Sequence, residues 1–162
     1  MVTGHRPHKI GNPQHPLRQW VVEQMRWHLN QLKPVVEQAV TGMAQGVDQD
    51  FAALCLELEI PYVAAVPFRG QDQFWSDRAR EIYQKLLQGA AEVVFVREEL
   101  DVPAAMALHD RNSWMVDYIG DDGIVLAVFD GTKGGTAHAV SRAKDRGRTI
   151  VRVDPTRFYE AE

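Results

Sequence analysis

Short runs of apolar residues alternate with longer segments in which apolar residues recur every three or four positions. The runs are apolar almost throughout, which is typical of strands that helices cover on both faces of a parallel sheet. We predict five strands from them, at residues 35–41, 62–66, 92–96, 124–129 and 149–153. A sixth strand is expected before Gly4, where only residues 1–3 precede the glycine, and we interpret this stub as an incomplete copy of a central strand.

The intervening segments have the period of amphipathic helices. In residues 17–32, an apolar stripe contains Leu17, Val21, Met25 and Leu29. Further helices are expected near residues 47–58, 73–88, 104–118 and 134–146. The alternation predicts an α/β fold, in which residues 1–162 form a single Rossmann-like, doubly wound domain around a mostly parallel sheet of about five to six strands.

Composition narrows the class of protein. The net charge of −4 gives no general attraction to nucleic acid or anionic membranes, although a local basic patch is compatible with it. Cys55 is the single cysteine, so an intrachain disulfide is excluded. Residues 1–13 lack the apolar region of a signal peptide, and no apolar run is long enough to cross a bilayer. We therefore expect a cytoplasmic protein without membrane association.

Glycine-containing turns follow three of the predicted strands, at residues 3–7 (TGHRP), 41–48 (TGMAQGVD) and 130–136 (DGTKGGT). Glycine allows a ligand to approach the backbone closely, and the first N–H groups of a following helix favour an anion. In an open α/β sheet such turns gather at the carboxyl ends of the strands. Each turn alone could be a tight connection, but the set indicates a phosphate site. None of them is a dinucleotide fingerprint or a P-loop.

Five motifs in order carry a family resemblance. They are TGHRP, the turn at 41–48, VPF-x-GQ at 66–71, RN-x-x-MVD at 111–117 and DG-x-x-GGT at 130–136. Over nearly the whole chain, this order resembles the YpsA-like branch of the SLOG superfamily, which also includes DNA-processing protein A and the LOG cytokinin-activating phosphoribohydrolases. The resemblance implies a Rossmann-like fold and a site for nucleotides or nucleotide-derived ligands.

The LOG enzymes carry MHxRKxxM followed by PGGxGTxxE, with the Arg and the final Glu implicated in cleaving a nucleoside monophosphate. Residues 108–115 (LHDRNSWM) resemble the first motif, including its His and Arg. Gly135 and Thr136 match the second, but Ala139 occupies the position of the Glu. That carboxylate would stabilise a cationic ribosyl transition state, so its replacement argues against LOG-type hydrolysis.

Several side chains have two interpretations at this stage. Arg6 either neutralises a phosphate or is a solvated surface residue, and for Arg111 the motif favours phosphate contact. Asp48 either caps a helix or contacts a ligand ribose, and Phe68 and Trp75 either stack on a base or pack in the core. The expected ligand-binding residues are Gly4, His5, Arg6, Gly42, Met43, Ala44, Gly46, Asp48, Arg111, Asn112, Asp130, Gly131, Gly134, Gly135 and Thr136.

We expect the chain to bind a small-molecule nucleotide or an ADP-ribose-like ligand, as a sensor or ligand-binding domain. The alternatives are hydrolysis of a nucleotide N-glycosidic bond and single-stranded DNA binding, the latter disfavoured by the acidic charge. His5, His8 and His138 lack a supporting Cys or carboxylate cluster, so we expect no metal site. Trp20 and Trp27 on one helix either pack internally or form a patch for self-association, and we expect a homo-oligomer.

Overall fold

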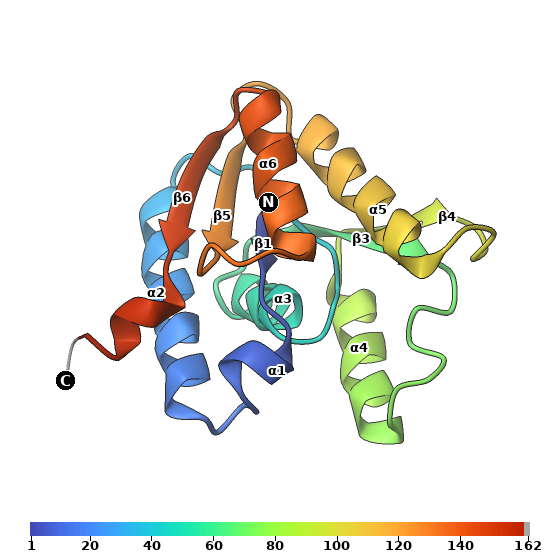
Figure 1. Cartoon of the computed structure of the whole chain (residues 1–162), viewed down its shortest axis with the longest axis horizontal. Helices are drawn as coiled ribbons and strands as arrows, with labels where there is room; N and C mark the ends of the chain where they lie inside the picture. The colour runs from blue at the N-terminus through green and yellow to red at the C-terminus, as the bar shows by residue number, and fades with distance from the viewer. Residues whose placement is uncertain (161–162) are drawn as a thin grey trace.

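The computed structural model describes residues 1–160, which form six parallel strands and the helices between them (Figure 1). The strands are β1 (Val2–Gly4), β2 (Ala39–Thr41), β3 (Tyr62–Phe68), β4 (Glu92–Arg97), β5 (Ile124–Val128) and β6 (Thr149–Val153). The helices are α1 (Pro7–Ile10), α2 (Pro16–Leu32), α3 (Val47–Glu57), α4 (Asp77–Gly89), α5 (Ala104–Tyr118) and α6 (Gly135–Asp145), followed by a 3-10 turn, η1 (Pro155–Phe158). The predicted Rossmann-like α/β fold is confirmed.

Hydrogen-bonded pairing divides the strands into two three-stranded groups, β1–β5–β6 and β2–β3–β4, where the sequence predicted one sheet. All four pairings are parallel. β1 and β2 lie next to each other between the two groups. Both strands are three residues long, which leaves few backbone groups to extend the ladder from one group to the other. Whether β1 is an incomplete copy of a longer strand stays a prediction.

Two apolar clusters, one on each face of the strands, explain why the runs are apolar throughout. Leu126 and Val128 of β5 belong to the cluster that includes residues of α2, α3 and α4. Val125 and Ala127 of the same strand belong to the cluster that includes residues of α5 and α6. Because successive side chains point to opposite faces, a strand covered on both sides needs apolar residues at every position.

Two element boundaries differ from the expectation by several residues, and two short elements were not predicted. The strand expected at 35–41 begins only at Ala39, because the backbone N–H groups of Val35 and Val36 donate to the Leu32 carbonyl in a turn that ends α2. The helix expected from residue 73 begins at Asp77, where the Ser76 hydroxyl accepts a hydrogen bond from the Ala79 N–H (3.3 Å). α1 and η1 were not predicted, since four residues are too few to show a period.

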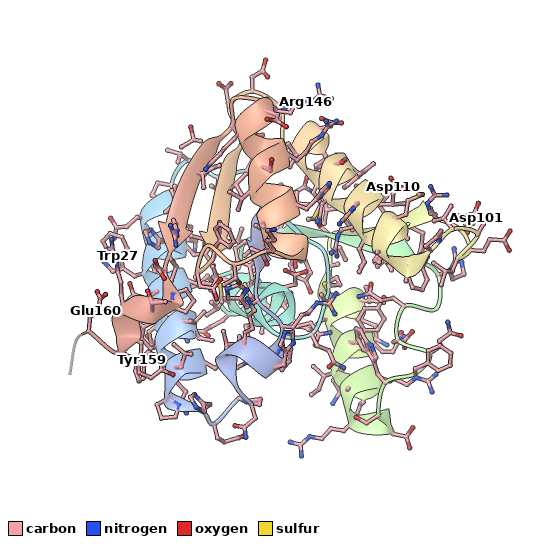
Figure 2. The ribbon with its side chains drawn as sticks, viewed as in Figure 1. Trp27, Asp101, Asp110, Arg146, Tyr159 and Glu160 are labelled. Carbon is pink, nitrogen blue, oxygen red and sulfur yellow. The ribbon has the colours of Figure 1, made fainter. Side chains whose placement is uncertain are left out.

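The two tryptophans of α2 have different surroundings. Trp20 is partly buried and packs on Phe158 of η1, with the ring centroids 6.1 Å apart. Trp27 is 58% exposed, and Tyr159 is also exposed on this side of the molecule (Figure 2). Trp20 therefore packs internally, whereas self-association through Trp27 stays a prediction. No helix within residues 1–160 is long and apolar enough to cross a membrane.

Candidate functional site

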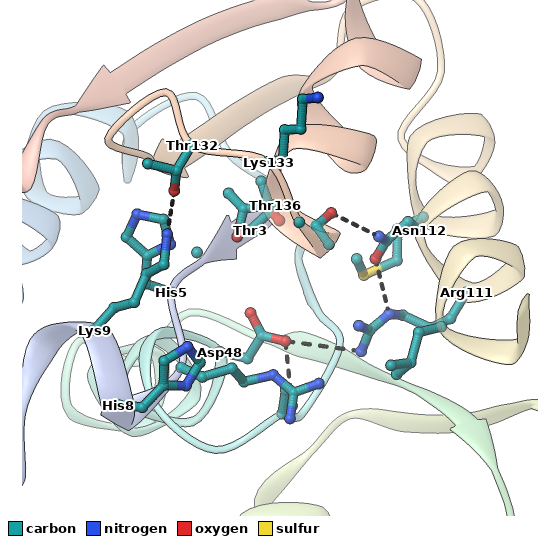
Figure 3. Close-up of a pocket in the computed structure, with 17 residues that line it drawn as sticks. Thr3, His5, His8, Lys9, Asp48, Arg111, Asn112, Thr132, Lys133 and Thr136 are labelled. Carbon is teal, nitrogen blue, oxygen red and sulfur yellow. Dashed lines mark hydrogen bonds and ion pairs between the residues drawn. The ribbon is translucent and has the colours of Figure 1, made fainter. Parts of the chain in front are cut away.

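A cavity of about 200 Å³ lies where β1, β2 and β5 end (Figure 3). β1 lies between β5 and β2, so the strand order reverses there, and such a crevice is where open α/β sheets bind ligands. Most of the predicted ligand-binding residues line this cavity, namely Gly4, His5, Arg6, Ala44, Asp48, Arg111, Asn112, Gly134, Gly135 and Thr136. The structure thus gathers all three glycine turns and the start of the RN motif around one space.

The remaining predicted residues, which are Gly42, Met43, Gly46, Asp130 and Gly131, are not part of the cavity lining. Gly42 and Met43 belong to the turn after β2, where the Met43 side chain is fully buried in the core. Gly46 is in the left-handed region (φ 97°) and lies against the His5 carbonyl, while Gly131 (φ 91°) lies in the turn after β5. These residues shape the turns from outside the lining.

The first turn of α6 presents backbone donors to the cavity. Gly134, with φ 148°, is the N-cap of this helix and supplies no side-chain cap, so the next N–H groups have no side-chain acceptor within residues 1–160. A Cβ built on Gly135 would meet nothing within 4 Å, so open space lies in front of this backbone. A helix start of this kind, open and lined by glycine, is suited to an anion.

Arg111 of α5 is a buried cation with several protein partners. Its Nη1 donates to the Gly42 carbonyl, and its Nε donates to Asn112 Oδ1 at 3.1 Å. Nη1 lies 3.8 Å from Asp48 Oδ2. Both residues are buried, with 5% of the surface of Arg111 and 6% of that of Asp48 exposed. Burial lowers the pKa of the Arg111 guanidinium, and Asp48 offsets only part of that change. Arg111 therefore holds the turn after β2 against α5, in addition to lining the cavity.

Asp48, in the first turn of α3, uses one of its carboxylate oxygens in the fold. Oδ2 accepts a hydrogen bond from the Ala44 N–H at 3.2 Å and faces Arg111. Oδ1 has no hydrogen-bond partner within residues 1–160, and it is not sealed from solvent. In Figure 3 this oxygen points into the open space. Burial raises the pKa of Asp48, although Arg111, the Ala44 N–H and Arg6 act in the opposite direction.

Asp130, which is outside the cavity lining, joins the ends of β1 and β5 to α1. Its Oδ1 lies 3.0 Å from His5 Nε2 and accepts hydrogen bonds from the Thr132 N–H (2.9 Å) and hydroxyl (2.6 Å). Its Oδ2 lies 3.4 Å from Lys9 Nζ. Burial would raise the pKa of Asp130, but the Thr132 hydrogen bonds and the charges of His5 and Lys9 hold it well below its usual range. Asp130 thereby positions groups that do line the cavity.

Sequence reasoning missed five polar residues of the lining, namely Thr3, His8, Lys9, Thr132 and Lys133. His8 and Lys9 belong to α1, whose signal was Pro7, since proline is favoured at the first position of a helix. Thr132 and Lys133 belong to the third glycine turn, in which only Asp130, the glycines and Thr136 were expected to bind a ligand. The cavity therefore has more cationic groups than the sequence indicated.

Other candidates from the sequence lie elsewhere. Phe68 is in the core, and Trp75 packs edge-on against Tyr83 with centroids 5.2 Å apart, so neither lines the cavity. His138 stacks on His109 at 3.9 Å. Ala139, at the position of the LOG glutamate, is a fully buried residue of α6. Residues 1–160 contain no group of three or more His, Cys, Asp or Glu side chains arranged to hold a metal ion.

Comparisons with known proteins agree with this architecture. Residues 1–151 match the family model YpsA, the YspA SLOG family. The uncharacterized SPbeta prophage-derived protein YoqJ of Bacillus subtilis (strain 168) is 32% identical over 143 residues, covering 76% of this chain and 80% of that protein. DNA processing protein A (DprA) from Streptococcus pneumoniae has a similar X-ray structure, with a TM-score of 0.65, 18% identity and coverage of 94% of this chain. This chain spans about half (49%) of that DprA chain, and the likeness concerns the fold.

Proposed function

Since this chain belongs to the YpsA family of SLOG proteins, as its motifs predicted, we propose that its cavity binds the phosphate group of a nucleotide or nucleotide-derived ligand. The observation that carries the proposal is that the open first turn of α6 and two cationic side chains line the same cavity. Arg6 and Lys133 line the cavity, and neither forms an ion pair within residues 1–160. Backbone donors and arginine together are the usual partners of a phosphate.

The charge of the lining supports an anionic ligand although the whole chain is acidic. Arg6, Lys9, Arg111 and Lys133 line the cavity, whereas Asp48 is its one lining carboxylate among the described residues. A local excess of positive charge inside a concave, partly desolvated space attracts anions despite a net charge of −4. The ligand expected from this chemistry is a mononucleotide or an ADP-ribose-like molecule.

We assign the cavity to binding or sensing rather than to LOG-type hydrolysis. The carboxylate required by that reaction is replaced by Ala139, which packs in the core. Single-stranded DNA is the alternative that the DprA likeness raises, and it enters the experiment as a competing ligand. DNA binding through backbone phosphates would weaken steeply as salt is raised.

The test is a titration of purified protein with inorganic phosphate, AMP, ADP-ribose and a short single-stranded DNA, followed by calorimetry and thermal melting. A ligand at a hundredfold excess over its Kd should stabilise the native state by about 2.7 kcal/mol. Gly135→Val should abolish this response, because its side chain would fill the space in front of the α6 backbone. Ser141→Val is the matched control, since it puts the same side chain on an exposed position of α6 outside the cavity lining.

Two outcomes would contradict the proposal. One is a melt that no phosphate-containing ligand shifts, and the other is a Gly135→Val protein that responds like the wild type. If DNA alone stabilises at physiological salt while phosphate and mononucleotides do not, the DNA-binding alternative replaces the nucleotide proposal.

A further inference from the structure

The cavity has two chemically different sides. On one side are the N–H groups at the start of α6 and the side chains of Thr132 and Lys133. On the other side is Asp48 of α3, which Figure 3 shows across the open space from Lys133 and Thr132. The first side attracts a phosphate. On the other side, Arg111 and Arg6 oppose the negative charge of Asp48, but the carboxylate oxygens can only accept hydrogen bonds. A ligand that fills the cavity therefore needs an anionic end and an end that donates hydrogen bonds.

The structural role of Asp48 does not account for its second oxygen. The N-cap of α3 is Gly46, and Asp48 Oδ2 accepts from Ala44 in the preceding turn. Among residues 1–160, no group donates a hydrogen bond to Oδ1, and only 7% of the Asp48 side chain is exposed. Removing a carboxylate from water is costly unless its oxygens are hydrogen-bonded. An open acceptor at the wall of a cavity is thus a place for a ligand donor.

We propose that Asp48 Oδ1 accepts a hydrogen bond from a sugar hydroxyl of the ligand, which makes the cavity a site for a ribose 5-phosphate group. The inference rests on the proposed function, since it places the phosphate at the start of α6. A carboxylate oxygen can only accept, and a hydroxyl can donate to it, whereas a phosphate oxygen at neutral pH is a poor donor. Asp48 therefore sets both the orientation and the class of the ligand.

The size of the cavity agrees with a phosphorylated sugar. Its volume of about 200 Å³ is below the roughly 300–1,000 Å³ typical of sites that enclose a whole drug-sized ligand. Most of the residues that line it are polar or charged, with Leu108 and Met115 as the large apolar members. A sugar phosphate fits such a lining, and the base of a nucleotide would extend beyond the cavity. Specificity should therefore depend on the sugar more than on the base.

The experiment compares Kd values for AMP, 2′-deoxy-AMP, 2′,3′-dideoxy-AMP and the 2′-fluoro-2′-deoxy analogue, with inorganic phosphate as a separate ligand. A hydrogen bond to a charged group contributes about 1.5–3 kcal/mol, so the dideoxy compound should bind at least about tenfold more weakly than AMP. If the 2′-hydroxyl is the donor, the fluoro analogue should bind as weakly as 2′-deoxy-AMP, because fluorine cannot donate.

Asp48→Asn is the diagnostic variant. Its amide oxygen can still accept from the Ala44 N–H, so this hydrogen bond of the preceding turn is kept, while an amide NH₂ group replaces the acceptor at the cavity. The ratio between AMP and dideoxy-AMP should fall to below about threefold, and the affinity for inorganic phosphate should stay or rise because the variant removes a negative charge. Cytidine and adenosine monophosphates should bind this protein with similar affinities in both variants.

The possible failures are distinguishable. Phosphate binding with an AMP to dideoxy-AMP ratio near one in the wild type would overturn the role of Asp48 and leave the proposed function standing. An unchanged high ratio in Asp48→Asn would do the same. If neither phosphate nor AMP binds, the proposed function fails together with this inference. The wild-type ratio decides the question even if the variant does not fold.

Discussion

Arg111 of α5 donates from its guanidinium to the main-chain carbonyl of Gly42, 69 residues earlier in the chain, and so fastens the turn after β2 to the opposite helical layer. Gly42 leaves the room that this contact requires, because a Cβ there would collide with the Arg111 guanidinium. The same arginine faces Asp48, whose free oxygen we assign to the ligand. The shape of the cavity and its chemistry thus depend on one buried contact.

Gly42→Ala should destabilise the protein by about 1–3 kcal/mol, the usual cost of forcing an extra group into a packed site. Gly135→Ala is the matched control, since a Cβ at position 135 meets nothing within 4 Å. Its free energy of unfolding in a denaturant titration should stay within about 0.5 kcal/mol of the wild type. Equal losses in the two variants would show that the contact with Arg111 is not the cause.

Arg111→Met should cost more, about 3–5 kcal/mol, because Asp48 would lose its cationic partner inside the protein. Adding Asp48→Asn to Arg111→Met removes the unpaired charge and should recover part of the loss. Denaturant titrations of both single variants and the double variant form the cycle that measures this coupling. A double variant less stable than Arg111→Met would contradict the assigned ion pair.

Lowering the pH should destabilise the native state already in the range where histidines titrate, above the range in which carboxylates titrate. Burial lowers the pKa of His5 below its ordinary value of 6.5, and the nearby charges of Lys9 and His8 act in the same direction, while Asp130 opposes them. Burial lowers the pKa values of His28 and His138 as well. The unfolded chain therefore binds protons that the folded chain does not, so the free energy of unfolding should fall as pH drops below about 6.5.

Each such histidine can contribute a slope of at most about 1.4 kcal/mol per pH unit, and His5→Gln should make the measured slope shallower. The measurement is a series of denaturant titrations between pH 8 and pH 5. A slope that is flat in the wild type, or identical in the variant, would show that His5 takes up its proton equally in both states.

The purified protein should not release adenine from AMP at the rate of a phosphoribohydrolase. The motivation is Ala139, which is fully buried and occupies the position where the resembling enzymes carry a glutamate. Chromatography of the reaction mixture detects the free base directly. Steady release of adenine by an activity that copurifies with the protein would restore N-glycosidic hydrolysis as the function. The reaction would then require another carboxylate, and Asp48 is the candidate in the cavity lining.

The apolar pattern was sufficient for the fold because the inner strands are buried on both faces, as in β3, where all seven residues are buried. The edge strands β4 and β6 are only partly buried but are still mostly apolar. The glycine turns come together at the carboxyl edge of the sheet, as the topology of a parallel α/β fold predicts. A local pattern could not show that Lys9 reaches Asp130, 121 residues away, or that Val35 is in a turn rather than a strand. Those features depend on tertiary contacts and on the turn that ends α2.

For the site, the sequence predicted most of the lining residues, but not which of their groups bind other protein groups and which stay open to a ligand. Asp48 and Arg111 were each weighed as ligand contacts, and the structure shows that both also bind protein groups. Asp130, expected at the ligand, holds His5, Lys9 and Thr132 instead. Which oxygen or nitrogen remains open is decided by side-chain geometry, which no spacing of residue types contains.

The most direct measurement of the central claim is an amide NMR titration of ¹⁵N-labelled protein with AMP. If the phosphate binds at the start of α6, the backbone N–H signals of Gly134, Gly135 and Thr136 should shift together and saturate with one Kd. Gly120 and Gly147, which lie in turns outside the cavity lining, provide internal reference signals. Shifts concentrated at these three amides are the result we predict. A saturating titration that moves other amides and leaves these three in place would contradict the account.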